Sequence, residues 1–187
     1  GSEMCIRDRI NDMGQTGLIT YMRTDSLRIS DEARAAAYDF IRNSSTPDSA
    51  NPSLWRNTEL NSLYGLFEVV DGVYQVRGYD VANVTFVKSD NGWIVFDCTT
   101  SSETAKAALE LLESKFGKAH IAAVVVSHAH IDHYGGIGGL IDEKNVADSS
   151  LPLDEQIKSG KTLIIVPEGY EKAVMEENVF AGNAMKR

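Results

Sequence analysis

Three of the four histidines in this chain of 187 residues fall within six positions of one another, together with one carboxylate. These four side chains are His128, His130, Asp132 and His133. Neutral imidazole and carboxylate are the usual ligands of zinc and similar divalent ions. A lone histidine is more often a surface residue or a hydrogen-bonded core residue, but this density favours a metal site.

The residues before this cluster predict how it is positioned. Residues 121–126 form an uninterrupted apolar run, Ile-Ala-Ala-Val-Val-Val, which is typical of a fully buried strand. Because side chains alternate along an extended segment, His128 and His130 should point the same way and bind one ion. Asp132 and His133 follow where the chain turns, so we expect them to reach a second ion close by.

The surrounding pattern predicts an α/β fold. Gly135 and Gly136 should allow a tight turn under the metals and the start of a short helix. Residues 102–116 carry an apolar stripe at helical spacing, and residues 161–167 predict the next buried strand. This order places metal ligands at the carboxyl end of a strand. His120 precedes the strand at its opposite end, so we assign it no metal role.

Antiparallel strands are predicted before these elements. Residues 66–96 contain four apolar runs, with turns at Asp71-Gly72 and at Asp90-Asn91-Gly92. Asp97 ends the last run. It could accept the outer hydrogen bond of a metal ligand or cap the next helix, and both interpretations stay open.

Helices are predicted at both ends of the chain. Residues 31–42 form one candidate, and residues 52–62, capped by Asn51, form a second that Leu54 and Trp55 should dock onto the sheet.

A last helix is predicted over residues 168–178. Glu171, Glu176 and Glu177 are expected to form its solvated face rather than to bind metal. Glu168 directly follows a predicted strand and is a further candidate ligand.

Composition limits the classes of partner. The formal net charge of -9 opposes a general affinity for nucleic acid or anionic membranes. Hydrophobic content of 43% and charged content of 24% are ordinary for a soluble globular protein, and no apolar run approaches the length of a membrane span. Two cysteines do not make a disulfide framework, so they leave the compartment open.

Residues 127–136, Ser-His-Ala-His-Ile-Asp-His-Tyr-Gly-Gly, also resemble the signature of the metallo-β-lactamase superfamily. Four further motifs resemble the alkyl sulfatases of that superfamily: residues 51–56, 65–69, 74–80 and 181–185. The resemblance runs from about Tyr38 to the last residue. It implies an α/β (α+β) fold that forms a partial metallo-β-lactamase αβ/βα sandwich, the first half only, with an N-terminal helical extension.

The resemblance implies two zinc ions and hydrolysis of alkyl sulfate esters such as dodecyl sulfate. His128 and His130 would bind one ion, and Asp132 and His133 the other. Asp132 could also orient the bridging hydroxide, which makes it the candidate catalytic residue. Asp97 matches the first conserved aspartate of the superfamily, near the metals. For the intact family the partners are a small alkyl sulfate and a second subunit of a homodimer, and the location can be periplasmic, secreted or cytoplasmic.

The N-terminal residues carry a different resemblance. Residues 1–9 look like a translated sequencing-adapter remnant, which we expect to be a disordered leader. Residues 10–37 resemble the active-site segment of type IA DNA topoisomerases, in which the tyrosine matching Tyr21 attacks DNA and the arginine matching Arg23 stabilises phosphate. Joined signatures of two families suggest a chimeric reading frame, with residues 38–187 as a truncated sulfatase domain.

Four functional interpretations therefore remain. The first is a fragment of an alkyl sulfatase, with weak metal binding and little or no turnover because further ligands lie downstream in that family. Another metallo-β-lactamase-fold hydrolase would share the histidine motif but not the motifs at residues 51–56 and 181–185. The third is a topoisomerase fragment, against which the net negative charge of the chain argues. The fourth is an assembly artefact without function.

Overall fold

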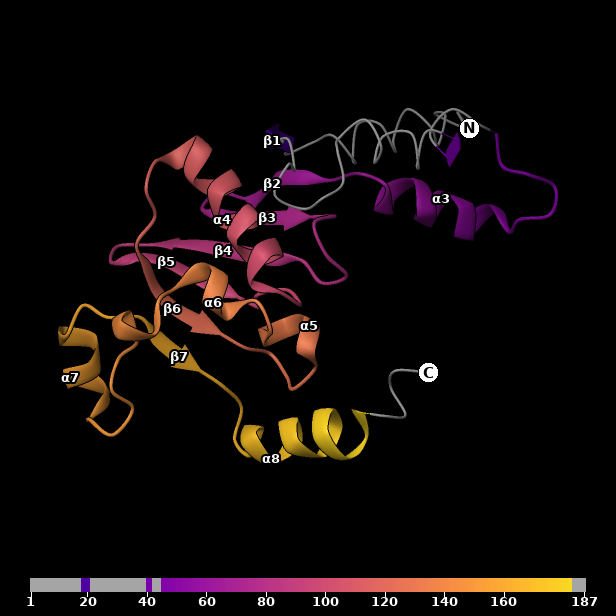
Figure 1. The fold of residues 1–187 in the computed structure, drawn as a ribbon. Helices are drawn as coiled ribbons and strands as arrows, with labels where there is room; N and C mark the ends of the chain where they lie inside the picture. Colours follow the sequence, from indigo (N-terminus) through magenta and orange to yellow (C-terminus); the bar gives the residue numbers. More distant parts are fainter. Residues whose placement is uncertain (1–17, 21–39, 42–44, 183–187) are drawn as a thin grey trace.

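The computed structural model describes residues 18–20, 40–41 and 45–182. These residues contain one seven-stranded sheet (Figure 1). Neighbouring strands follow chain order, antiparallel from β1 to β5 and parallel from β5 to β7. The strands are β1 (Leu18–Thr20), β2 (Gly65–Val70), β3 (Val73–Arg77), β4 (Val84–Ser89), β5 (Gly92–Phe96), β6 (Ile121–Val125) and β7 (Leu163–Ile165). The predicted change from antiparallel hairpins to a parallel α/β unit is confirmed.

Helix α4 connects β5 to β6 and packs on one face of the sheet, with α6 against it (Figure 1). The helices are α3 (Pro52–Asn61), α4 (Ser102–Phe116), α5 (Ile131–Tyr134), α6 (Ile137–Leu140), α7 (Leu153–Lys158) and α8 (Tyr170–Val174), with a 3-10 turn at Glu143–Asn145 and a π-helical segment, η3, at Met175–Phe180. Within the described ranges, no helix has the length and apolar character needed to cross a membrane.

The α4 helix forms as its sequence predicts. Ser101 caps it by accepting a hydrogen bond from the Thr104 amide at 3.3 Å, and Gly117 ends it with a φ of 78°. Its buried side, which includes Leu111 and Leu112, packs on the sheet, and each such fully buried leucine contributes about 2 kcal/mol. Phe116 stays 37% exposed, at the margin of this core.

The α3 helix confirms its predicted cap but not its predicted packing. Asn51 Oδ1 accepts a hydrogen bond from the Ser53 amide at 2.9 Å. Leu54 is 63% exposed, so the expectation that it docks the helix was wrong. Trp55 is partly buried and meets Phe40 edge to face, with ring centroids 6.3 Å apart. Most of the predicted helix over residues 31–42 lies outside the described residues.

The second face of the sheet is only partly covered by the described residues. Phe96, Val125 and Ile165 lie in register across β5, β6 and β7. Phe96 is 42% exposed and Ile165 is 46% exposed. The strand predicted over residues 161–167 therefore forms as β7, but its predicted burial was wrong. A parallel sheet needs cover on both faces, and the helices described here cover one.

Gly135 and Gly136 are needed for close packing rather than for an unusual turn. Their φ values are −61° and −87°, which any residue adopts. A Cβ at Gly136, however, would overlap the carbonyl oxygen of Cys98 and lie 2.7 Å from Ala105 Cβ. The absence of a side chain therefore lets the chain after the histidine cluster rest against the start of α4.

Candidate metal centre

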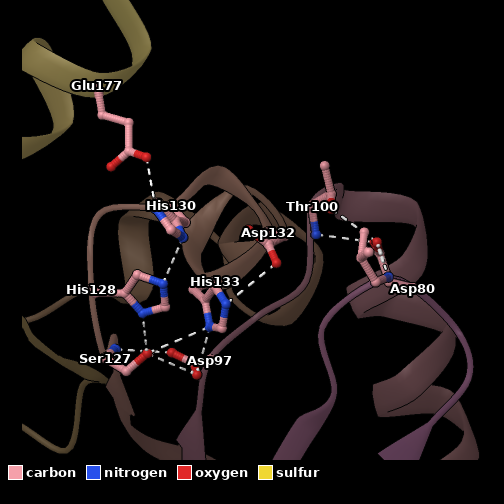
Figure 2. Close-up of polar contacts among 10 residues, drawn as sticks. Asp80, Asp97, Thr100, Ser127, His128, His130, Asp132, His133 and Glu177 are labelled. Carbon is pink, nitrogen blue, oxygen red and sulfur yellow. Dashed lines mark hydrogen bonds and ion pairs between the residues drawn. The ribbon is translucent and has the colours of Figure 1, made fainter. Parts of the chain in front are cut away.

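The histidine cluster lies on the loop that leaves β6 and on the first turn of α5 (Figure 2). His128 and His130 lie side by side, with His128 Nε2 2.9 Å from His130 Nδ1. The predicted alternation along the extended segment is consistent with this arrangement. The two facing nitrogens are donor atoms of the kind that a single divalent ion binds.

Asp132 and His133 form a second pair. Asp132 Oδ2 lies 3.3 Å from His133 Nε2, and the two side chains are 30% and 22% exposed. The ring of His133 also approaches that of His128, with centroids 4.0 Å apart. The structure therefore brings together all four residues that the sequence singled out, as two adjacent pairs.

Asp97 supports the cluster from the end of β5. Its Oδ2 lies 2.8 Å from His133 Nδ1, and its Oδ1 accepts a hydrogen bond from the Ser127 amide at 2.9 Å. The Ser127 hydroxyl lies 2.8 Å from His128 Nδ1. Since Ser101 caps α4, the open question about Asp97 is resolved in favour of the outer hydrogen bond to a histidine.

The backbone around Asp97 is held in an uncommon conformation. Asp97 and Thr99 have φ values of 59° and 63°, in the left-handed region. Two hydrogen bonds join this loop to the histidine segment: the Cys98 amide donates to the His133 carbonyl at 2.9 Å, and the Gly136 amide donates to the Thr99 carbonyl at 3.0 Å. These contacts offset the cost of the conformation and fix the carboxylate of Asp97 beside His133.

Glu177 reaches the cluster from η3, and sequence reasoning missed it. Its Oε1 lies 2.7 Å from His130 Nε2, and its side chain is 28% exposed. The expectation of a solvated face therefore fails for Glu177, although Glu176 is 62% exposed and lies 3.6 Å from Lys172 Nζ. No local signal separates the two glutamates, because η3 is a π-helical turn and the 3.6-residue period does not predict its phase.

Burial favours the protonated form of two neighbouring groups, Cys98 and Tyr170. Burial, followed by the nearby Asp97, raises the pKa of the Cys98 thiol to about 12. Burial, followed by the Tyr134 ring, raises the pKa of Tyr170 to about 12. The Tyr134 and Tyr170 rings meet edge to face at 5.8 Å. His120 and Glu168 are exposed, and no contact joins either to the cluster among the described residues.

The chemistry of these side chains fits a metal ion, but the described side chains converge only in pairs. Within residues 18–20, 40–41 and 45–182, no three histidine, cysteine or acidic side chains converge in the arrangement that binds one ion. Each pair offers two donors, and the nitrogen of His130 and His133 that does not face its pair partner has a carboxylate beside it. That combination of facing donors and outer carboxylates is common where histidine binds zinc.

Comparison with known proteins shows which family this chain resembles. Residues 77–165 match the family model described as the metallo-beta-lactamase superfamily. A linear primary-alkylsulfatase from Pseudomonas sp is 45% identical over 80% of this chain and 21% of its own length. An (R)-specific secondary-alkylsulfatase from Pseudomonas sp is 44% identical over 81% of this chain and 21% of its length. The chain thus spans about a fifth of these relatives.

A solved structure gives the same result. The stereoselective inverting sec-alkylsulfatase Pisa1 from Pseudomonas sp superposes with a TM-score of 0.74 and 38% identity, over 94% of this chain and 26% of that one. The topoisomerase resemblance is not shown by these matches, and Tyr21 and Arg23 lie outside the described residues. Residues 77–165 are therefore a segment of the metallo-beta-lactamase superfamily, and the chain is similar to the alkylsulfatases within it.

Proposed function

We propose that this chain is part of a dinuclear zinc hydrolase that cleaves alkyl sulfate esters. The observation that carries the proposal is the pairing of donor atoms, His128 Nε2 with His130 Nδ1 and Asp132 Oδ2 with His133 Nε2. The similarity to alkylsulfatases supports the choice of substrate class.

Each residue has a proposed role. His128 and His130 hold one ion, and Asp132 and His133 hold the other. When bound, the zinc ions would lower the pKa of a coordinated water towards neutrality and neutralise charge on the ester oxygens. The carboxylate of Asp132 is the group that would accept a proton from the attacking water and orient it. Asp97 keeps His133 Nε2 turned towards Asp132 by holding Nδ1.

Zinc should bind weakly to this polypeptide. Catalytic zinc sites commonly have three protein ligands, whereas each pair of described side chains supplies two. We expect slow turnover of dodecyl sulfate for the same reason.

Homodimer formation, which the family resemblance implies, remains a prediction, as do the adapter-like origin of residues 1–9 and the chimeric origin of residues 10–37. Sequencing of the genomic locus across residues 35–40 would decide the chimera.

Calorimetric titration with zinc tests the proposal. Wild-type protein should bind zinc, and a variant that combines His128→Ala with His133→Ala should bind none. His120→Ala is the matched control, because that exposed histidine lies at the opposite end of β6 and should leave zinc binding unchanged. Equal zinc binding by the double variant and the control would refute the metal centre, and tight binding of two equivalents would refute the weak-affinity expectation.

A sulfate-release assay with dodecyl sulfate tests the substrate class. Zinc-loaded wild-type protein should release sulfate slowly, and Asp132→Asn should abolish the release while zinc binding persists in part. Turnover of a thioester or a β-lactam with no release of sulfate would instead assign the chain to another hydrolase of the superfamily.

A further inference from the structure

The η3 segment is attached to the histidine loop by two successive residues. Glu177 Oε1 lies 2.7 Å from His130 Nε2. Asn178 Nδ2 donates a hydrogen bond to the Ala129 carbonyl at 3.1 Å. Figure 2 shows His130 between Glu177 on one side and His128 on the other, so its two ring nitrogens face different partners.

The contact with Glu177 determines where His130 carries its proton. A neutral imidazole has one N–H, and a carboxylate can only accept a hydrogen bond. At 2.7 Å from Glu177, His130 Nε2 must therefore be the protonated nitrogen. Nδ1 is then the nitrogen with a free lone pair, and it is the atom that faces His128 Nε2.

His133 differs from His130, because a carboxylate lies beside each of its ring nitrogens. Asp97 Oδ2 lies 2.8 Å from His133 Nδ1, and Asp132 Oδ2 lies 3.3 Å from Nε2. The contacts of His133 therefore fix the orientation of its ring but do not select one neutral tautomer in the metal-free protein. Only the contacts of His130, with one carboxylate and one imidazole, select the nitrogen that carries the proton.

We infer that Glu177 is a positioning residue that holds His130 in the tautomer protonated at Nε2 and so presents Nδ1 for metal binding. The part of this inference that concerns metal rests on the proposed function. Outer carboxylates of this kind orient the ring and raise its basicity as a ligand, and their removal commonly costs 10- to 100-fold in metal affinity. Glu176, its exposed neighbour, makes no contact of this kind among the described side chains.

Nitrogen NMR of the imidazole rings tests the tautomer in metal-free protein. At about pH 8, where imidazole is ordinarily neutral, wild-type His130 should be protonated at Nε2. Glu177→Ala should give a mixture of tautomers, and Glu177→Gln should largely keep the wild-type form, because its amide oxygen still accepts a hydrogen bond. Glu176→Ala is the matched control on the same segment and should leave the signal unchanged. Equal tautomer populations in Glu177→Ala and Glu176→Ala would overturn the inference.

Zinc titration of the same variants adds the functional readout. Glu177→Ala should weaken zinc binding by about 10- to 100-fold, with Glu177→Gln between it and wild type. Asn178→Ala removes the other attachment of η3 and should leave the tautomer unchanged, which separates loss of docking from loss of the carboxylate. Wild-type affinity in Glu177→Ala would overturn the inference. If wild-type protein binds no zinc, the proposed function fails, and the NMR result alone decides the role of Glu177.

Discussion

Replacing Asp80 with asparagine tests what holds the loop that carries Asp97. Asp80 Oδ1 accepts hydrogen bonds from the Val81 amide at 2.6 Å and the Thr100 hydroxyl at 2.9 Å. Its Oδ2 accepts from the Thr100 amide at 3.0 Å and the Thr104 hydroxyl at 2.7 Å. Figure 2 shows this contact between Asp80 and Thr100 beside the histidine cluster. One carboxylate thus joins the segment after β3 to the segment that leads into α4.

The expected cost follows from the donors that lose their acceptor. Asparagine offers one carbonyl oxygen in place of two carboxylate oxygens, and its NH₂ group must face either the Thr100 amide or the Val81 amide. A hydroxyl can turn to accept, but a backbone N–H cannot, so one amide loses its partner. Loss of a charged acceptor costs about 1.5 to 3 kcal/mol, and half-burial of Asp80 places the estimate near 2 kcal/mol.

The effect should depend on pH with a definite sign. Burial tends to raise the pKa of Asp80, but hydrogen bonds from Thr104, Thr100 and Val81 lower it below the ordinary value. A depressed pKa in the folded state stabilises the protein above the unfolded pKa of about 4, and that stabilisation is lost as the pH falls through the folded pKa. The difference between wild type and Asp80→Asn should therefore be full at neutral pH and shrink in acid.

Urea unfolding followed by tryptophan fluorescence measures this difference, because Trp93 is buried in the core. Asp142→Asn is the control: Asp142 is 70% exposed and lies 3.4 Å from Lys144 Nζ, so its loss should change the free energy of unfolding by less than about 0.5 kcal/mol. The reasoning is refuted if Asp80→Asn loses no more stability than the control at about pH 7, or if its deficit grows between pH 7 and about pH 3.

Two further substitutions test packing and burial beside the cluster. Gly136→Ala should destabilise the fold by about 3 kcal/mol or more in thermal unfolding, because the new Cβ would overlap backbone atoms. Gly138→Ala is the control and should cost far less, because its Cβ would meet only Ser102 Oγ, at 3.1 Å. Equal losses of stability in the two variants would contradict this prediction. Burial raises the pKa of Cys98 to about 12, which keeps its thiol protonated and unreactive. In a Cys5→Ser variant, whose one remaining cysteine is Cys98, a thiol reagent at about pH 8 should therefore label the chain only after unfolding. Rapid labelling of the folded protein would show that the thiol is accessible.

Local periodicity accounts for what could be predicted from the sequence. The apolar runs and turns over residues 66–96 and the helical spacing over residues 102–116 depend on neighbours a few positions apart, and they appear as β2 to β5 and α4. The predicted strand at residues 161–167 formed but is largely exposed, because its burial depends on cover for a second face. Gly136 was identified correctly for the wrong reason, since a close approach between distant segments leaves no pattern in the local sequence.

Orientation of the histidines is the part that local sequence could not supply. The density of His128, His130 and His133 indicates a metal site, but it does not say which ring nitrogen of each is free. For His130 that choice is made by Glu177 in η3, and for His133 the ring is oriented by Asp97 at the end of β5. Because both carboxylates act through contacts between distant elements, a substitution that shifts η3 should alter the candidate site without touching any residue of the histidine motif.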